Sequence, residues 1–192
     1  MEKVFVGGKY MFFNNESTTK YNIKVNCTLE ELRKKILDIC YVNERSYYKL
    51  NIYMIPDEVD ILTLNDLKQL ESYALIQDLD GLNKKIIHKV GNTTTSGDID
   101  DVIAIKELLK KLNYNELMYI NYDIYSYSKE NSYIEVKNIL KQGLFIEGND
   151  ELLDLLANLD ISYDTSNLKF DNEKIALDSV KREIKIVENN NK

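Results

Sequence analysis

Carboxylate side chains are numerous in this chain, and they could do chemistry. They can hold a metal ion, act as general acid and base, or imitate the phosphates of DNA. Residues 55–82, IPDEVDILTLNDLKQLESYALIQDLDGL, carry seven acids and one lysine, a net charge of −6. Residues 147–178 carry nine acids and two lysines, a net charge of −7, while the whole 192-residue chain has −7. Two acidic segments therefore sit on a mildly basic remainder.

We expect the candidate site to be an acidic, partner-binding surface drawn from these two segments. Its residues are Asp57, Glu58, Asp60, Asp66, Glu71, Asp78, Asp80, Glu147, Asp150, Glu151, Asp154, Asp160 and Asp164. Nothing in their spacing selects a catalytic pair or a metal site. The chain also lacks GxxxxGK[ST], GxGxxG, HExxH and GxSxG motifs. We therefore expect no catalytic residue, no metal and no cofactor, and a protein that is not an enzyme.

Two further features could do chemistry, but each has a plainer interpretation. His88, the single histidine, lies in the alternating stretch KKIIHKV, which favours a partly exposed strand histidine over a catalytic base. Asp98, Asp100 and Asp101 precede an apolar helical pattern. Helix capping explains these three acids better than a metal site, because negative charge stabilises the N-terminus of a helix.

Composition indicates a soluble globular protein, with 44% hydrophobic and 30% charged residues. No apolar run approaches the length of a membrane span, and the N-terminus does not resemble a signal peptide. Cys27 and Cys40 do not form a Cys-x-x-Cys pair, so a reducing, cytoplasmic environment suits them.

The periodicity of apolar residues predicts the elements that position these side chains. Strands are expected at residues 4–13 around Gly7-Gly8, and at 20–25, 48–55, 84–90 and 118–125. Helices are expected from Thr28, from Thr63, at 98–114, at 132–143, at 149–159 and from Asn172. Capping boxes support the helices that begin at Thr28 (with Glu31) and at Ser132 (with Glu135). Residues 91–97, GNTTTSG, are expected to form a linker or exposed loop.

These elements predict an α+β fold of two to three small domains in an elongated arrangement. An N-terminal antiparallel sheet with one helix is expected at 1–60, and a mixed central domain at 61–142. A more helical, acidic C-terminal domain is expected at 143–192.

Two stretches resemble ArdA-type antirestriction proteins. The first runs from VFVGGKYMFF to LNIYMIPDEVDILTLNDLKQLESY, with Leu64-Asn65-Asp66-Leu67 at the place of that family's Leu-Asn-x-Leu helix start. The second is VKNILKQGLFIEGNDELLDLLANLDISYDTSNLKF, in which Leu159–Tyr163 departs from the family's Tyr-Ile-Asp-Tyr-like element.

The resemblance implies a non-enzymatic anti-defence protein, dimeric, whose carboxylates imitate DNA phosphates. The implied partner is a protein with a basic DNA-binding cleft, such as a Type I restriction-modification enzyme. Neither nucleic acid nor membrane is an expected partner. An alternative remains open, because the first 90 residues also resemble a β-grasp or PB1-type interaction module that would dock a basic partner through its acidic segment.

Overall fold

The computed structural model describes residues 2–6, 9–13, 21–79, 83–91, 93–130 and 132–190. The helices are α1 (Leu29–Asp38), the 3₁₀ helix η1 (Leu67–Gln69), α2 (Val102–Lys111), α3 (Leu152–Asn158) and α4 (Asn172–Asn190). The strands are β1 (Glu2–Val6), β2 (Lys9–Phe13), β3 (Tyr21–Lys24), β4 (Val42–Pro56), β5 (Ser72–Asp78), β6 (Lys84–Val90), β7 (Thr93–Asp98), β8 (Tyr114–Lys129), β9 (Ser132–Ile139) and β10 (Gly143–Gly148).

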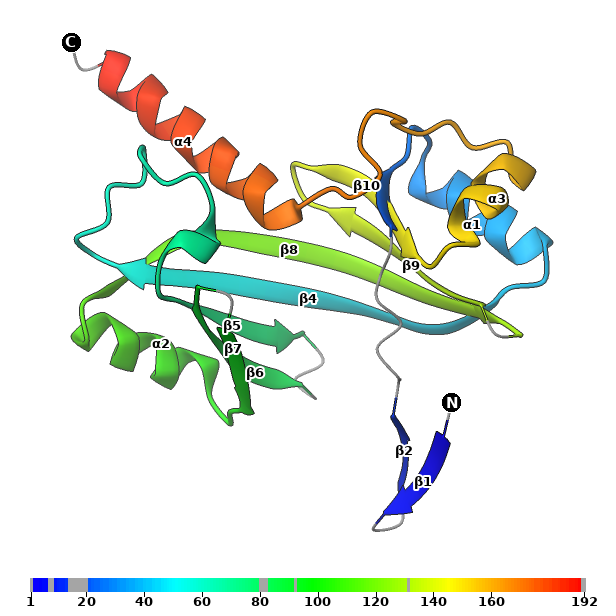
Figure 1. Cartoon of the computed structure of the whole chain (residues 1–192), viewed down its shortest axis with the longest axis horizontal. Helices are drawn as coiled ribbons and strands as arrows, with labels where there is room; N and C mark the ends of the chain where they lie inside the picture. Colours follow the sequence, from blue (N-terminus) through cyan, green and yellow to red (C-terminus); the bar gives the residue numbers. More distant parts are fainter. Residues whose placement is uncertain are drawn as a thin grey trace. The chain divides into compact units, whose positions relative to one another are not determined.

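One eight-stranded sheet organises most of these elements (Figure 1). Its strand order is β3-β10-β9-β8-β4-β5-β6-β7, and β1 pairs separately with β2. The predicted arrangement of small domains with a helical C-terminal part is therefore wrong. Strands that run from residue 21 to residue 148 join the same sheet, because their unpaired backbone groups need partners.

The chain divides into two compact units, each built from distant segments. Unit 1 contains Met1–Glu44, Ser126–Val136 and Leu144–Phe170. Unit 2 contains Arg45–Tyr125, Lys137–Gly143 and Asp171–Lys192. The boundaries expected at residues 60/61 and 142/143 stay a prediction.

Alternation along β4 gives unit 2 its core. Leu50, Ile52 and Met54 point to one face of the sheet, where they pack with Leu75 and with α2. Asp101 starts α2 by accepting hydrogen bonds from the Ile103 and Ala104 amides, at 2.8 and 3.1 Å. The expected capping role of the acids near residue 100 is thus confirmed for Asp101.

The core of unit 1 lies around α1, α3, β3 and β10. Its fully buried side chains include Ile23, Leu32, Ile36, Phe145 and Leu156. Thr28 caps α1 by accepting a hydrogen bond from the Glu31 amide, as the capping box predicts. Residues 162–170 add backbone hydrogen bonds to β3, including Asn22 N to Leu168 O at 3.0 Å.

Three predicted elements take a different structure. Residues 63–73 form η1 and the start of β5 in place of a helix, and residues 93–98 form β7 in place of a linker. The expected helix at 132–143 is strand β9, in which Ile134, Val136 and Ile139 are buried. Tyr133, Ile134 and Val136 are β-formers, so pairing within the sheet overrides the capping-box signal.

The remaining predicted elements are confirmed, with shifted ends. β4 and β8 are longer than predicted, with 15 and 16 residues, and α2 is shorter, with 10. β1 and β2 match the two predicted N-terminal strands, while Gly7 and Gly8 lie outside the described residues. No helix in the described part is long and apolar enough to cross a membrane.

Candidate functional site

The face of unit 2 opposite α2 is polar. Residues of β4 that alternate with its core positions, Lys49, Asn51 and Tyr53, point to this face. In an antiparallel sheet, directly paired residues share a face. Asn51 pairs with Ile76 of β5, which pairs in turn with Lys85 of β6. We call this surface the polar face.

A carboxylate from α4 joins two side chains of the polar face. Glu173 lies in the first turn of α4, and Lys89 Nζ is 2.8 and 3.0 Å from its two carboxylate oxygens. The Tyr53 hydroxyl donates to Glu173 Oε1 at 3.1 Å. Figure 1 shows α4 on the side of β4 and β8 opposite to α2, in agreement with these contacts.

Burial keeps Tyr53 neutral. Loss of hydration is the largest cause that raises its pKa well above 10, and the neighbouring Tyr122 and Glu173 raise it further. A neutral tyrosine has one proton to donate, which goes to Glu173, so its oxygen accepts from Asn51 Nδ2 at 3.2 Å. Asn51 Oδ1 is buried and has no hydrogen-bond partner in the described structure.

Two more cations lie on the same face. Lys49 Nζ lies 5.0 Å from the centre of the Tyr122 ring. Arg45 forms an ion pair with Asp78 at 3.0 Å, and its guanidinium stacks 4.1 Å above the Tyr47 ring. Asp78 is buried and also accepts from Asn83 Nδ2 at 2.7 Å. The polar face thus presents four cations, Arg45, Lys49, Lys85 and Lys89.

The start of α4 is anchored beside the polar face. Gln142 and Asn172 exchange two hydrogen bonds, from Gln142 Nε2 to Asn172 O at 3.0 Å and from Asn172 Nδ2 to Gln142 Oε1 at 3.1 Å. Because Glu173 follows Asn172 directly, these bonds hold its carboxylate near Lys89.

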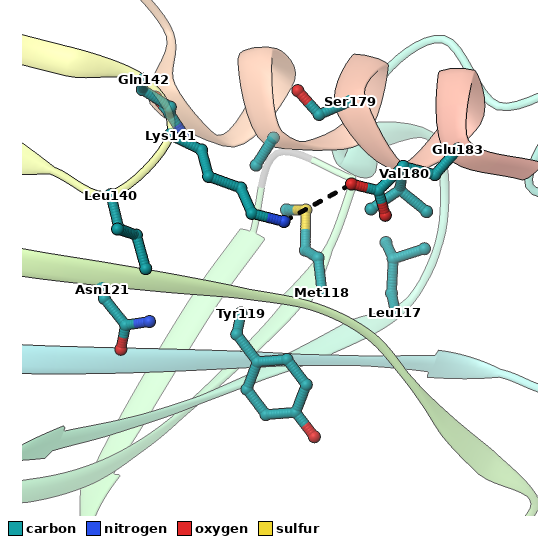
Figure 2. A pocket seen from close by; sticks show the side chains of 11 residues that line it. Leu117, Met118, Tyr119, Asn121, Leu140, Lys141, Gln142, Ser179, Val180 and Glu183 are labelled. Carbon is teal, nitrogen blue, oxygen red and sulfur yellow. Dashed lines mark ion pairs between the residues drawn. The ribbon is translucent and has the colours of Figure 1, made fainter.

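A hollow of about 320 Å³ is lined by residues of α4, of β8 and of the turn from β9 to β10. Figure 2 shows Met118 among its lining side chains and the Lys141–Glu183 ion pair, at 3.5 Å, which joins the turn to α4. Both charged side chains are mostly exposed, so this pair contributes little stability and can open at little cost.

A second polar cluster occupies the face that carries α2. His88 Nε2 lies 2.8 Å from Glu71 Oε1, and the His88 ring stacks on Tyr73 with centroids 4.5 Å apart. Hydrogen bonds from His88 and Tyr114 lower the pKa of Glu71, and burial and Glu71 raise the pKa of Tyr114 to about 12. His88 is a partly exposed strand residue, as predicted.

The predicted acidic residues of unit 2 scatter over different surroundings. Asp57, Glu58 and Asp60 are exposed after β4, and Asp66 caps η1. Glu71 and Asp78 lie on opposite faces of the sheet, in the two clusters described above. Asp80 lies outside the described residues.

The predicted acidic residues of unit 1 lie around β10 and α3. Glu147 is in β10 and Asp154 is in α3, while Asp150, Glu151, Asp160 and Asp164 lie in the adjoining turns. Asp164 accepts hydrogen bonds from the amide and hydroxyl of Ser166, at 2.9 and 2.5 Å, which lower its pKa. The predicted site residues of the two segments therefore belong to different units, although Glu173 of the second segment lies in unit 2. Their role as one partner surface stays a prediction.

The described residues were also considered as metal ligands and as disulfide partners. Among the described residues, no group of three or more His, Cys, Asp or Glu side chains could hold a metal ion. Cys27 and Cys40 are free thiols.

No protein-family model and no curated protein matches this sequence. Solved structures do match the fold. The PH1012 protein of Pyrococcus horikoshii OT3 is 13% identical, with a TM-score of 0.59 over 81% of this chain and 98% of that chain. A Hippeastrum protein, described as a candidate adenylyl cyclase with a dominant triphosphatase activity, is 9% identical, with a TM-score of 0.58 over 83% and 94%. A candidate adenylate cyclase from Vibrio parahaemolyticus is 12% identical, with a TM-score of 0.56 over 80% and 93%.

At these identities the matches show a shared fold, and they correct the predicted function. A non-enzymatic DNA mimic is the wrong interpretation, because the chain has a fold found in proteins described as adenylate cyclases and as a triphosphatase. The expectation that the chain is not an enzyme is contradicted with it. The β-grasp alternative is also wrong, because β3 to β7 belong to the eight-stranded sheet. The resemblance to ArdA proteins and the homodimer are not tested by these matches.

Part of the polar face has a signal in the sequence, namely the alternation of residues along β4 and β6. Lys49, Asn51 and Tyr53 alternate with the core residues Leu50, Ile52 and Met54 of β4. In β6, Lys85 and Lys89 point to the face opposite to that of the core residue Ile86. Glu173 carries no comparable signal, since it meets Lys89 from 84 residues away.

Proposed function

We propose that this protein binds a triphosphate on the polar face of unit 2 and hydrolyses it. The observation that carries the proposal is the set of four cations, Arg45, Lys49, Lys85 and Lys89, projecting from β4 and β6 on a fold found in proteins named for triphosphate chemistry. Lysine and arginine bind phosphate oxygens through charge-assisted hydrogen bonds. The spacing also suits a chain of phosphates, because Lys85 and Lys89 are four residues apart in a strand, about 13 Å.

The reaction follows from this charge arrangement. Water attacks the terminal phosphorus, the bond to the bridging oxygen breaks, and the diphosphate part leaves with the electron pair, while the proton that the water loses passes to a phosphate oxygen or to solvent. Phosphoryl transfer is accelerated mainly by positioning and by positive charge around the phosphate oxygens. The substrate is the Mg²⁺ complex of the triphosphate, since Mg²⁺ is commonly held by substrate phosphates with only one or two carboxylates.

A cytoplasmic location belongs to this proposal. The free thiols of Cys27 and Cys40 suit a reducing compartment.

Two neighbouring lysines of β6 provide a matched test. Lys85 faces the polar face, whereas Lys84 points to the other face, where its ammonium donates to Asp100 O at 2.8 Å. We expect Lys85→Gln to lower kcat/KM for release of phosphate from Mg²⁺-ATP by about tenfold, the effect of one charge-assisted hydrogen bond. Lys84→Gln should leave kcat/KM close to that of the unmodified protein. Equal losses in both variants, or no phosphate release by the unmodified protein, would contradict the proposal.

A further inference from the structure

Glu173 places a negative charge inside the site proposed for a polyanion. Its two carboxylate oxygens lie 2.8 and 3.0 Å from Lys89 Nζ, and Oε1 also accepts from the Tyr53 hydroxyl at 3.1 Å. Phosphate oxygens accept from the same kinds of donor. The carboxylate therefore occupies the place beside Lys89 where a phosphate group would bind.

The surroundings of Glu173 keep its carboxylate at this place. Tyr53 is buried and neutral, so its proton stays directed at Glu173. The hydrogen bonds between Gln142 and Asn172 anchor the start of α4, and Leu177, one turn further along the helix, is fully buried. Glu173 cannot leave Lys89 without the loss of these contacts.

A ligand can reach the ion pair between Lys89 and Glu173. The two side chains are 22% and 32% exposed. The other acids of the polar face are placed differently. Asp78 is buried against Arg45, and Asp98, opposite Lys85 in the edge strand β7, is exposed, so that solvent screens its charge.

The contact with Glu173 makes binding of an anion to Lys89 costly. If Lys89 holds both a phosphate oxygen and Glu173, two acceptors of one ammonium group lie within about 6 Å of each other, and their like charges repel. If Lys89 leaves Glu173 for the phosphate, the carboxylate loses its charged partner. Repulsion in both cases grows with the negative charge of the ligand.

Mg²⁺ reduces this cost, because a metal ion bound to phosphate oxygens cancels part of their charge. We infer that Glu173 is a specificity-determining residue, which makes the polar face bind the Mg²⁺ complex of a triphosphate in preference to the metal-free anion. This inference rests on the proposed function, since it places the triphosphate beside Lys89.

Calorimetry with β,γ-methylene-ATP, whose terminal phosphate cannot be released by hydrolysis, tests the role of Glu173. Binding is measured with Mg²⁺ and with EDTA. We expect Glu173→Gln to bind the metal-free ligand about tenfold more tightly than the unmodified protein, because one like charge near the phosphates is removed. Its affinity for the Mg²⁺ complex should change by less than that.

Two further variants serve as controls. Glu173→Asp keeps the charge and should keep the preference for the Mg²⁺ complex. Glu183→Gln makes the same change as Glu173→Gln ten residues further along α4, about 15 Å away, at an acid that pairs with Lys141. It should bind both forms of the ligand as the unmodified protein does. Thermal unfolding checks that the Glu173 variants are folded.

The outcomes separate this inference from the proposed function. An unchanged preference in Glu173→Gln would overturn the role of Glu173 and leave triphosphate binding standing. Weaker binding of the Mg²⁺ complex, with unchanged binding of the metal-free ligand, would make Glu173 a ligand of the metal and would also overturn the inference. Failure of the unmodified protein and of Glu173→Gln to bind either form would overturn both.

Discussion

Glu71 illustrates how much a single carboxylate of this chain depends on its neighbours. It meets His88 at 2.8 Å and also receives the hydroxyl of Tyr73 at 3.5 Å. Together with the hydrogen bond from Tyr114, these contacts join residues of β5, β6 and the start of β8, although Glu71 itself is exposed. An acidic residue that the sequence marks as part of a partner surface thus contributes to packing between strands.

The lowered pKa of Glu71 predicts a pH dependence of stability. A carboxyl group whose pKa is lower in the folded state stabilises that state above its ordinary pKa, here 4.5. The stabilisation is lost as the pH falls through the lowered value. We expect the free energy of unfolding to drop in the unmodified protein as the pH falls below 4.5 and through the lowered pKa of Glu71, and to drop less in Glu71→Gln.

Urea unfolding at several pH values measures this dependence. Glu58→Gln, at an exposed position after β4, is the matched control. An identical pH profile for Glu71→Gln and the unmodified protein would show that Glu71 has no folded-state partner.

At the residue scale, the structure confirms the predictions that depend on local sequence patterns. Thr28 and Asp101 cap helices as their spacing predicts, and the core positions of β4 follow from alternation. The polar face could not be predicted from the sequence, because its prediction requires knowing which strands are neighbours in the sheet. Lys49, Lys85 and Glu173 come from β4, β6 and α4, and only the fold brings them to one surface.

At the scale of elements, the N-terminus of α2 offers a clear test. Asp101 accepts two backbone amides there, whereas the side chain of Asp100 is exposed. We expect Asp101→Ala to lower the free energy of unfolding by about 1 kcal/mol, because two amides lose their acceptor. Asp100→Ala should change it by only a few tenths.

Chemical denaturation of the two alanine variants measures the difference. Similar values for both would mean that charge near the helix end, which the two acids share, matters more than the hydrogen bonds of Asp101.

The elements that the sequence did not predict are those whose structure depends on pairing with other strands of the sheet. Ser132 and Glu135 form an apparent capping box, yet β9 places Ile134 and Val136 in the core. GNTTTSG looks like a loop because it has no apolar residue, yet Thr93–Asp98 pair with β6 along their whole length. An exposed edge strand needs no apolar face, so hydrophobic alternation cannot reveal it.

At the scale of the whole molecule, net charge gives a misleading view of function. The chain carries −7, which favours an acidic, partner-binding interpretation. The sheet nevertheless gathers four cations on one face of unit 2, because alternate residues of β4 and β6 point there. Asp78 and Glu173 pair with Arg45 and Lys89, so Lys49 and Lys85 supply the positive charge that these carboxylates do not balance. A polyanion responds to this local field, which the overall charge does not describe.

Lysine-selective chemical footprinting of the unmodified protein, with and without Mg²⁺-ATP, tests the central claim most directly. Bound triphosphate should shield the ammonium groups of Lys49, Lys85 and Lys89 from acetylation. Lys84, on the opposite face, should react equally in both conditions. Equal protection of Lys84 and Lys85, or no protection of the three polar-face lysines at saturating Mg²⁺-ATP, would contradict a triphosphate site on this face.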